Sequence, residues 1–232
     1  MKTTLITFLF LLIALLSYSH VSGNAAPDVV RDTNGDILRV RTAYLILPCL
    51  SSTGGGITLA SLRNETCPLD VVQSLDKNDS GVLPLEFYPR NSKKGVIRES
   101  TDLTISFAGE ASCVESLIWK LVNYNGEQIV STRGLPRNPG AETWFKIEKH
   151  LSGYKIIFCP TVCKTCKLLC GNLGISAKNG ARRLVLTDEP FMIKFCCSSS
   201  YHAPDQIFNK FVTFAAHFLH YVNQFSWSAK VN

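Results

Sequence analysis

Four closely spaced cysteines are the residues of this chain with the clearest capacity for chemistry. They are Cys159, Cys163, Cys166 and Cys170, separated by three, two and three residues. Four such sulfurs can close a tetrahedral shell around zinc or pair into two disulfides. The spacing differs from the paired knuckles of zinc sites and therefore favours disulfides. The choice between a zinc site and two disulfides also depends on whether the protein folds in an oxidising compartment.

The chain begins with residues that predict a secretory signal peptide. Lys2 gives a positive start, residues 5–16 form an apolar core, and residues 21–23 offer small side chains for cleavage. The apolar run is shorter than the roughly 20 residues that cross a bilayer. We therefore expect residues 1–23 to be removed and the protein to be secreted to the apoplast, or alternatively to reach the vacuole. Disulfides form and persist on that route.

Patterns typical of catalysis do not occur in the sequence. It has no Gly-x-Ser-x-Gly elbow, no His-Glu-x-x-His helix, no phosphate-binding glycine loop and no dinucleotide motif. His150 is the one histidine between the leader and residue 200, and beside Lys149 it is typical of a solvated turn. The net charge of +6, or +5 without Lys2, is scattered rather than gathered in a basic stripe. We expect no enzyme, no cofactor, no metal and no nucleic-acid partner.

A basic stretch is the best candidate for a binding element. Residues 81–98 have apolar positions at both ends and a polar, basic centre, which predicts an exposed loop between two strands. The alternative is that these basic side chains only solvate a loop tip. The centre of the stretch consists of Pro89, Arg90, Asn91, Ser92 and Lys93.

Short strands must hold this loop and the cysteines in place. Residues 103–107, 144–147 and 191–195 alternate between apolar and polar positions, as half-buried strands do. Turn signals separate such segments, for example at Asn125-Gly126 and at residues 76–81. About 200 residues follow the leader, enough for one all-β domain. The pattern predicts a closed all-β architecture and leaves sandwich and barrel undecided.

A turn near the start of the expected mature chain carries a family resemblance. Residues 30–38 read Val-Arg-Asp-Thr-Asn-Gly-Asp-Ile-Leu, and Tyr44-Leu45-Ile46 follows. Asp and Asn can bond their own backbone and Gly accepts positive φ, so the run predicts a hairpin. As an ordered string it resembles the N-terminal signature of the plant Kunitz inhibitor family, the soybean trypsin inhibitor and miraculin group.

The resemblance extends over about residues 27–195 and implies a β-trefoil, with three four-stranded units around a pseudo-threefold axis. Residues 44–46, 118–121 and 154–157 look like equivalent segments of the three units. We expect a signal peptide at residues 1–23, a Kunitz-type domain at residues 24–195 and an atypical tail at residues 196–232.

The resemblance also implies disulfide pairs. They are Cys67 with Cys113, Cys159 with Cys170, and Cys163 with Cys166. Three further cysteines, Cys49, Cys196 and Cys197, lie outside this scheme. The sequence leaves open a bridge from Cys196 or Cys197 to Cys49, a disulfide-linked dimer, or free thiols.

The stretch at residues 81–98 resembles the protease-binding loop of the family. A loop already held in an extended form loses little entropy on docking. A basic residue suits a trypsin-like pocket with its buried carboxylate, which favours Arg90, with Asn91 and Lys93 as second choices. The family also includes inhibitors of cysteine and aspartic proteases, and it supports this loop with an asparagine whose matching position here is Val40. Valine cannot donate that bond.

The alternative to a protease inhibitor is a non-inhibitory trefoil for storage, defence or miraculin-like carbohydrate or receptor binding.

Two further expectations concern modification and the tail. Asn64 and Asn78 fit the N-glycosylation rule and lie in loop-like stretches. The tail has apolar residues at helical spacing, which predicts an amphipathic helix that docks on the barrel, lies at a membrane surface or serves in sorting. Its apolar face consists of Ile207, Phe211, Phe214, Phe218, Tyr221 and Phe225.

Overall fold

The computed structural model describes residues 26–50, 52, 54–62, 69–77, 81–109, 116–134, 139–163, 166, 169–178 and 180–198. The expected signal peptide, the sequons at Asn64 and Asn78, the Cys67–Cys113 bridge and the tail beyond residue 198 lie outside these ranges. None of the described residues belongs to a helix that is long and apolar enough to cross a membrane.

The described part of the chain is built from strands, with one short 3-10 helix, η2, at Ala141–Thr143. The strands are β1 (Tyr44–Pro48), β2 (Ile57–Ala60), β3 (Asp70–Gln73), β4 (Leu85–Pro89), β5 (Leu103–Phe107), β6 (Trp119–Tyr124), β7 (Glu127–Thr132), β8 (Lys146–His150), β9 (Gly153–Phe158), β10 (Gly171–Ser176), β11 (Arg183–Thr187) and β12 (Ile193–Cys197).

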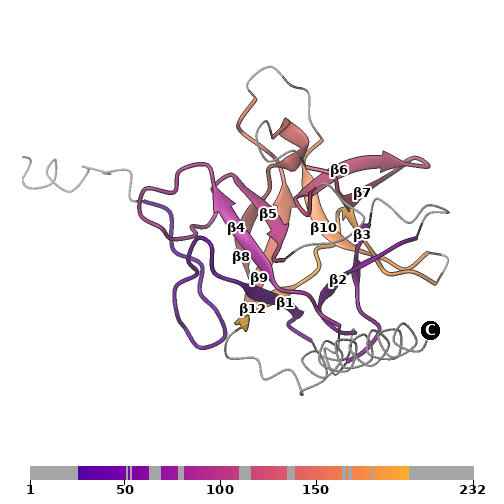
Figure 1. Cartoon of the computed structure of the whole chain (residues 1–232), viewed down its shortest axis with the longest axis horizontal. Coiled ribbons are helices and arrows are strands. Elements are labelled where there is room, and N and C mark those ends of the chain that lie inside the picture. The colour runs from indigo at the N-terminus through magenta and orange to yellow at the C-terminus, as the bar shows by residue number, and fades with distance from the viewer. Residues whose placement is uncertain are drawn as a thin grey trace, which may run out of the picture.

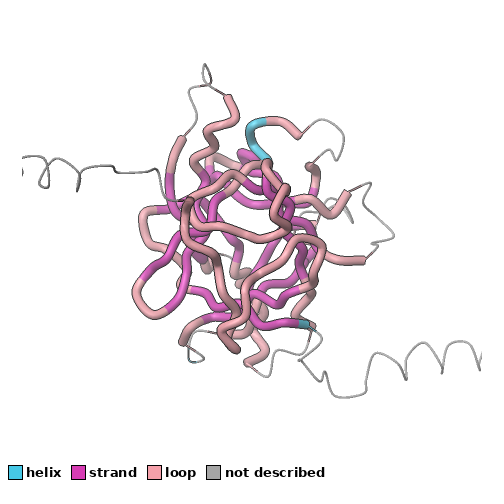
Figure 2. Tube along the Cα trace, turned by 90° about the vertical axis from the view of Figure 1, so that its left-hand side faces the viewer, coloured by secondary structure: helices cyan, strands magenta, loops and turns pink. Residues whose placement is uncertain are grey.

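Six of these strands close into a barrel. The strand β1 pairs with β4, β4 with β5, β8 with β9, β9 with β12, and β12 returns to β1. The remaining gap, between β5 and β8, is joined by the bridge between Leu103 and Phe145. Closure removes the unpaired edges that would invite association with other chains. Figure 2 shows the strands grouped in the body of the domain, with loops crossing its near face and projecting at its edges.

The other six strands form three hairpins that cover one end of the barrel. These are β2–β3, β6–β7 and β10–β11. Each hairpin touches the other two, through the pairs Asp70 with Ser131, Val185 with Ile129, and Arg183 with Val72. Four consecutive strands, two in the barrel and two in the hairpin, thus repeat three times. The fold is a β-trefoil (Figure 1), and the expected fold class is confirmed.

The expected internal repeat was only partly right. Residues 44–46 lie in β1 and residues 154–157 in β9, which are the first strands of their units. Residues 118–121, however, run into β6, the second strand of its unit, and the true equivalent is β5. Both segments alternate apolar side chains at the same period, so the pattern could not separate a barrel strand from a hairpin strand.

Aromatic side chains fill the barrel. Phe87 in β4 and Phe195 in β12 meet edge to face with ring centroids 5.5 Å apart. Trp119 meets Phe145 in the same way at 6.0 Å, and Phe145 packs on Phe158 at 5.7 Å. These five side chains are at most 2% exposed. Edge-to-face pairs add to the stabilisation that burial alone gives, so this cluster ties all three units together.

The two ends of the domain meet. Asp32 Oδ1 accepts hydrogen bonds from the N–H groups of Asn34 and Asp36, both at 2.9 Å, and Gly35 has φ of 86°. This is the turn that the sequence predicts. The Thr33 N–H donates to the carbonyl oxygen of Phe195 in β12. Since β12 runs to Cys197, the expected domain boundary at residue 195 falls inside a strand, and the trefoil continues beyond it.

Candidate functional site

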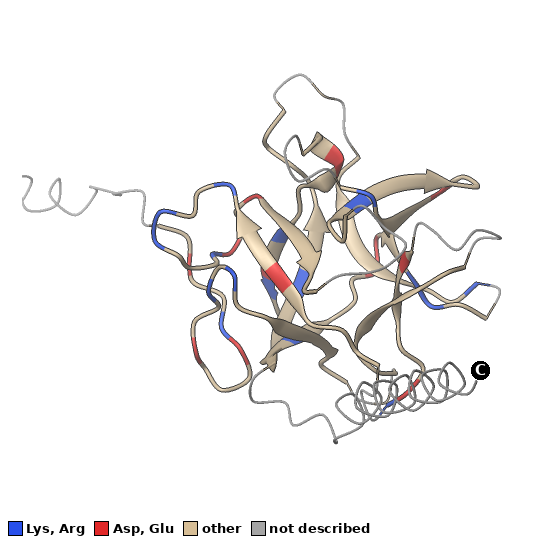
Figure 3. Cartoon of the chain, viewed as in Figure 1, with Lys and Arg blue, Asp and Glu red and all other residues tan. Residues whose placement is uncertain are grey.

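The basic stretch forms the connection between β4 and β5, where the first unit of the trefoil passes to the second (Figure 1). Pro89 ends β4, and Arg90, Asn91, Ser92, Lys93 and Lys94 are all exposed. Figure 3 shows Lys and Arg positions along this projecting loop in blue. The structure therefore places the expected residues on one accessible loop, as the pattern predicts.

The mouth of the loop is closed by main-chain hydrogen bonds. The Arg90 N–H donates to the carbonyl oxygen of Asp102 at 2.9 Å. The next residue, Leu103, exchanges two main-chain hydrogen bonds with Phe145, at 2.9 and 2.8 Å. Because Phe145 and Leu103 are fully buried, the point where the loop leaves the barrel is fixed to the core.

The tip of the loop is a tight turn. The Gly95 N–H donates to the carbonyl oxygen of Ser92 at 2.8 Å, and Gly95 has φ of 63°. The side-chain oxygen of Asn91 accepts a longer hydrogen bond of 3.4 Å from the Lys93 N–H. Lys93 and Lys94 therefore occupy the two central positions of a reverse turn, whereas Arg90 lies before it. The extended form expected for the loop ends before Lys93.

The position of the missing family asparagine, Val40, supports the loop in another way. Its N–H donates to the carbonyl oxygen of Gly95 at 3.1 Å, while its side chain packs against the core. Further along, Ile97 accepts a hydrogen bond from Val30 and donates one to Leu38. The N-terminal segment thus lies beside the returning half of the loop and holds it by main-chain bonds.

Polar contacts continue along this returning half. The guanidinium of Arg98 donates to the carbonyl oxygen of Pro27 at 2.5 Å. The Thr101 hydroxyl donates to the carbonyl oxygen of Arg98 at 2.8 Å, and the Glu99 N–H donates to that of Asp28 at 2.9 Å. A hollow is lined by both segments, including Pro27 of the N-terminal segment and Arg90 of the loop. The N-terminal segment that precedes β1 therefore lies against the returning half of the loop.

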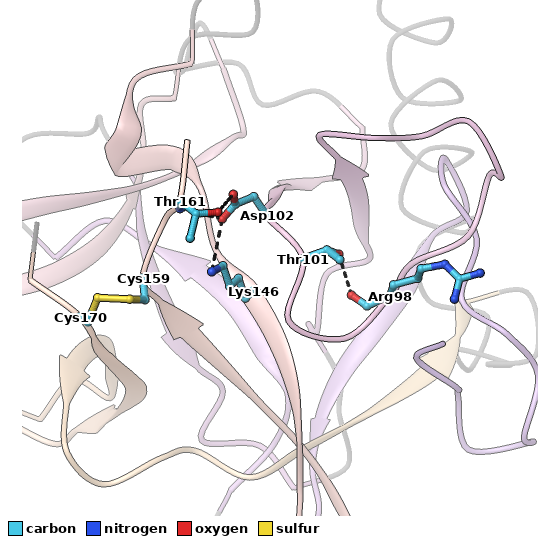
Figure 4. A network of polar contacts seen from close by, with 7 residues as sticks. All are labelled: Arg98, Thr101, Asp102, Lys146, Cys159, Thr161 and Cys170. Atoms are coloured by element: carbon cyan, nitrogen blue, oxygen red, sulfur yellow. Dashed lines mark hydrogen bonds and ion pairs between the residues drawn. A yellow bond between two sulfur atoms is a disulfide. The ribbon is translucent and has the colours of Figure 1, made fainter. Parts of the chain in front are cut away.

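Asp102 joins the loop to a segment far away in sequence. Its buried carboxylate accepts hydrogen bonds from both the N–H and the hydroxyl of Thr161, and the amine of Lys146 lies 3.8 Å from it (Figure 4). The hydrogen bond from the Thr161 N–H is 3.1 Å long. No sequence pattern singled out Asp102 or Thr161, because the two residues are 59 positions apart and carry no local signal of the contact.

Thr161 belongs to the cysteine cluster, which the structure shows to be oxidised. Cys159 is bonded to Cys170 and Cys163 to Cys166, with Cα–Cα distances of 4.5 and 5.5 Å. These are the two nested pairs that the resemblance implies. All four sulfurs are consumed, so the cluster offers no thiolate to zinc.

The remaining cysteines do not form the bridge to Cys49. The Cys49 N–H bonds the carbonyl oxygen of Met192, whereas Cys196 lies opposite Leu45 in the β1–β12 pair. Four residues along a strand correspond to about 13 Å, well beyond the reach of a disulfide. Of the three alternatives that the sequence left open, the structure excludes a bridge from Cys196 to Cys49 within one chain. Cys49 and Cys196 carry free thiols, and burial raises the pKa of the Cys49 thiol.

The strand that leads into the loop has a polar outer face. The Tyr88 hydroxyl donates a hydrogen bond to a carboxylate oxygen of Glu86. Burial, followed by this hydrogen bond, raises the pKa of Tyr88 to about 12.

His150, the one histidine considered for catalysis, ends β8 opposite Gly153 in a hairpin. Within the described residues, no cluster of His, Cys, Asp or Glu could hold a metal ion.

Comparisons with known proteins agree with this architecture. A family model described as "trypsin and protease inhibitor", the legume Kunitz model, matches residues 30–196. The chain is 40% identical over 195 residues to Kunitz trypsin inhibitor 5 of Arabidopsis thaliana, covering 81% of this chain and 95% of that protein. It is 43% identical over 188 residues to miraculin of Synsepalum dulcificum, covering 75% and 85%.

A solved structure gives the same result. A Kunitz-type cysteine protease inhibitor from potato is similar with a TM-score of 0.64 and 30% identity, over 75% of this chain and 98% of the potato chain. The family match thus covers the whole trefoil, including the β4–β5 loop and both observed disulfides. The chain belongs to the plant Kunitz family of trypsin and protease inhibitors, whose members are inhibitors rather than enzymes.

Proposed function

We propose that this protein inhibits a trypsin-like serine protease, with the segment from Pro89 to Lys93 in the protease cleft and Arg90 in its primary pocket. The observation that carries the proposal is the position of Arg90. Its side chain is exposed on a projecting loop, while its N–H is fixed to the core end of the same loop through Asp102. A trypsin inhibitor of Arabidopsis thaliana is among the relatives and matches 81% of this chain.

The chemistry of recognition follows from the side chain. A guanidinium can donate two parallel hydrogen bonds to a carboxylate at the bottom of a pocket. Pro89 fixes φ immediately before Arg90, and β4 keeps the preceding residues extended. Less conformational entropy is then lost on docking, so contacts in the cleft are converted more fully into affinity.

The same geometry explains why such a loop would resist digestion. If the protease cut the bond after Arg90, the Arg90 side of the cut would stay tied to Asp102 and the other side would stay tied through Gly95 to Val40. The new ends would remain near each other instead of diffusing apart. Rejoining them would then compete with release, because the reacting groups are held at high effective concentration.

The proposed setting is outside the cytosol. The expected signal peptide and the two observed disulfides both support secretion, since disulfides persist in the oxidising secretory route. We place the protein in the apoplast or vacuole, with a glycan at one of the sequons Asn64 and Asn78, Asn64 being favoured, in plant defence or in the control of endogenous proteolysis.

Two observations favour a second candidate, a non-inhibitory trefoil. Lys93 and Lys94 lie in a hydrogen-bonded turn rather than in an extended segment, and Val40 replaces the side chain that supports the loop in the family. Miraculin is among the similar proteins, and its name is not that of an inhibitor. In this alternative the protein would serve in storage or defence, or would bind a carbohydrate or a receptor.

The experiment that separates the two measures inhibition of trypsin, chymotrypsin and a papain-like protease by the oxidised protein without its leader. Arg90→Ala should raise the inhibition constant for trypsin by about 30- to 900-fold, since a buried Arg anchor contributes roughly 2 to 4 kcal/mol. Lys77→Ala removes an exposed charge from another turn and should change nothing.

The remaining outcomes also discriminate. Loss of inhibition in Lys93→Ala but not in Arg90→Ala would keep the function and move the pocket residue. Inhibition of the papain-like enzyme alone would keep an inhibitor and exclude the trypsin-like target. Failure against all three proteases would favour the non-inhibitory trefoil.

A further inference from the structure

Asp102 occupies the point where the exposed loop returns to the barrel. Its carbonyl oxygen accepts the hydrogen bond from the Arg90 N–H, so the main chain of Asp102 closes the loop mouth. The residue that follows, Leu103, is the first residue of β5. Any displacement of the Asp102 main chain would therefore shift or break the hydrogen bond to the Arg90 N–H.

The side chain of Asp102 is held from the opposite direction. It is buried, with 6% of its side chain exposed, and accepts two hydrogen bonds from Thr161 while Lys146 approaches one oxygen. A buried carboxylate is costly unless it is paired and hydrogen-bonded, so these contacts restrict it to one orientation. Hydrogen bonds to an ionised group are also stronger than those between neutral groups.

Thr161 is itself restrained by the oxidised cysteine cluster. It follows Cys159 by two positions, inside the loop that the Cys159–Cys170 bridge closes (Figure 4). The chain of contacts therefore runs from the disulfide through Thr161 and the Asp102 carboxylate to the Asp102 carbonyl and the Arg90 N–H. No covalent bond joins the β4–β5 loop directly to the loop closed by Cys159–Cys170. We call the contact between Asp102 and Thr161 the clasp; through it the disulfide loop can restrain Arg90.

We propose that Asp102 and Thr161 are positioning residues that hold the β4–β5 loop rigid for protease binding. The proposal deepens the proposed function and rests on it for its effect on inhibition. Neither residue enters the protease cleft. Loosening the clasp lets Arg90 leave its docked conformation, which shortens the lifetime of the complex and leaves the tie at Gly95 in place.

The experiment combines hydrogen exchange with protease kinetics on the oxidised full domain. Thr161→Val removes the hydroxyl at an exposed position, so the variant should fold, and Thr161→Ser keeps the hydroxyl. Asp102→Asn removes the charge. Thr187→Val serves as the matched control, because the hydroxyl oxygen of Thr187, at the end of β11, accepts a hydrogen bond from the Glu189 N–H and has no contact with Asp102.

We expect the Arg90 amide to exchange about 10-fold faster in Thr161→Val, consistent with loss of a charged hydrogen bond, and dissociation from trypsin to accelerate similarly. Thr161→Ser should match the parent, and amides of the buried strand β1 should be unaffected. An unchanged exchange rate at the Arg90 amide, or an equal acceleration at the amides of β1, would overturn the proposal that the clasp restrains Arg90. Hydrogen exchange requires no protease, so it tests this proposal even if the parent protein fails to inhibit trypsin.

Discussion

The two nested disulfides give a prediction whose size follows from the structure. The Cys159–Cys170 bridge closes a separation of 11 residues, and the Cys163–Cys166 bridge a separation of three. In the chain-entropy model the first contributes roughly 2.8 kcal/mol to the free energy of unfolding and the second roughly 1.6 kcal/mol. Replacing both cysteines of the outer pair by serine should therefore destabilise the domain more than the same change in the inner pair.

The assay is urea unfolding followed by tryptophan fluorescence. Trp119 is fully buried against Phe145, so its emission reports on the barrel core. The outer double variant should lose about 1 kcal/mol more of the free energy of unfolding than the inner one. Because both variants exchange two sulfurs for two hydroxyls, each is the control for the other. Equal losses, or a larger loss in the inner variant, would refute the loop-closure reasoning.

Three further predictions concern the loop, β4 and the barrel. Val40→Asn should lower the inhibition constant for trypsin about 5-fold, because the amide can add one hydrogen bond to the loop; an unchanged constant would argue against support from this position. The phenol of Tyr88 should titrate near pH 12 in near-ultraviolet absorbance, and Glu86→Gln should lower that pKa. The folded-state pKa of Tyr88 lies above the ordinary value of 10.0. The contribution of the protonated Tyr88 phenol to the free energy of unfolding is therefore present below pH 10 and is lost as the pH rises towards 12. Gly153→Ala should destabilise the domain by about 1 to 3 kcal/mol, because the new Cβ would lie 2.3 Å from the Cys49 sulfur and 2.6 Å from a main-chain oxygen of β12. Adding Cys49→Ala should restore only part of that loss in a urea titration, since the main-chain oxygen cannot yield.

Local patterns in the sequence predicted local structure well. The strand at residues 103–107 is β5 without correction, and Asn125-Gly126 is the β6–β7 turn, with φ of 51° and 80°. The Asp32 turn also forms as its side-chain chemistry requires. In each case the signal and the structure lie within a few residues of each other.

Contacts between distant segments could not be predicted in this way. The clasp between Asp102 and Thr161 depends on two loops from different units meeting at the barrel rim. The impossibility of a Cys49–Cys196 bridge depends on the register of β1 against β12, which alternation alone does not fix. The trefoil itself needed the family resemblance, because alternating strands fit a sandwich as well as a barrel.

The most direct test of the central claim is the position at which trypsin cuts the protein during long incubation at a catalytic ratio. A loop that occupies the cleft as a substrate does is cut slowly at the bound peptide bond. The account predicts a single cut between Arg90 and Asn91 in a protein that still inhibits, found by sequencing the new N-terminus. A cut after Lys93 or Lys94, or general digestion without a stable complex, would contradict it.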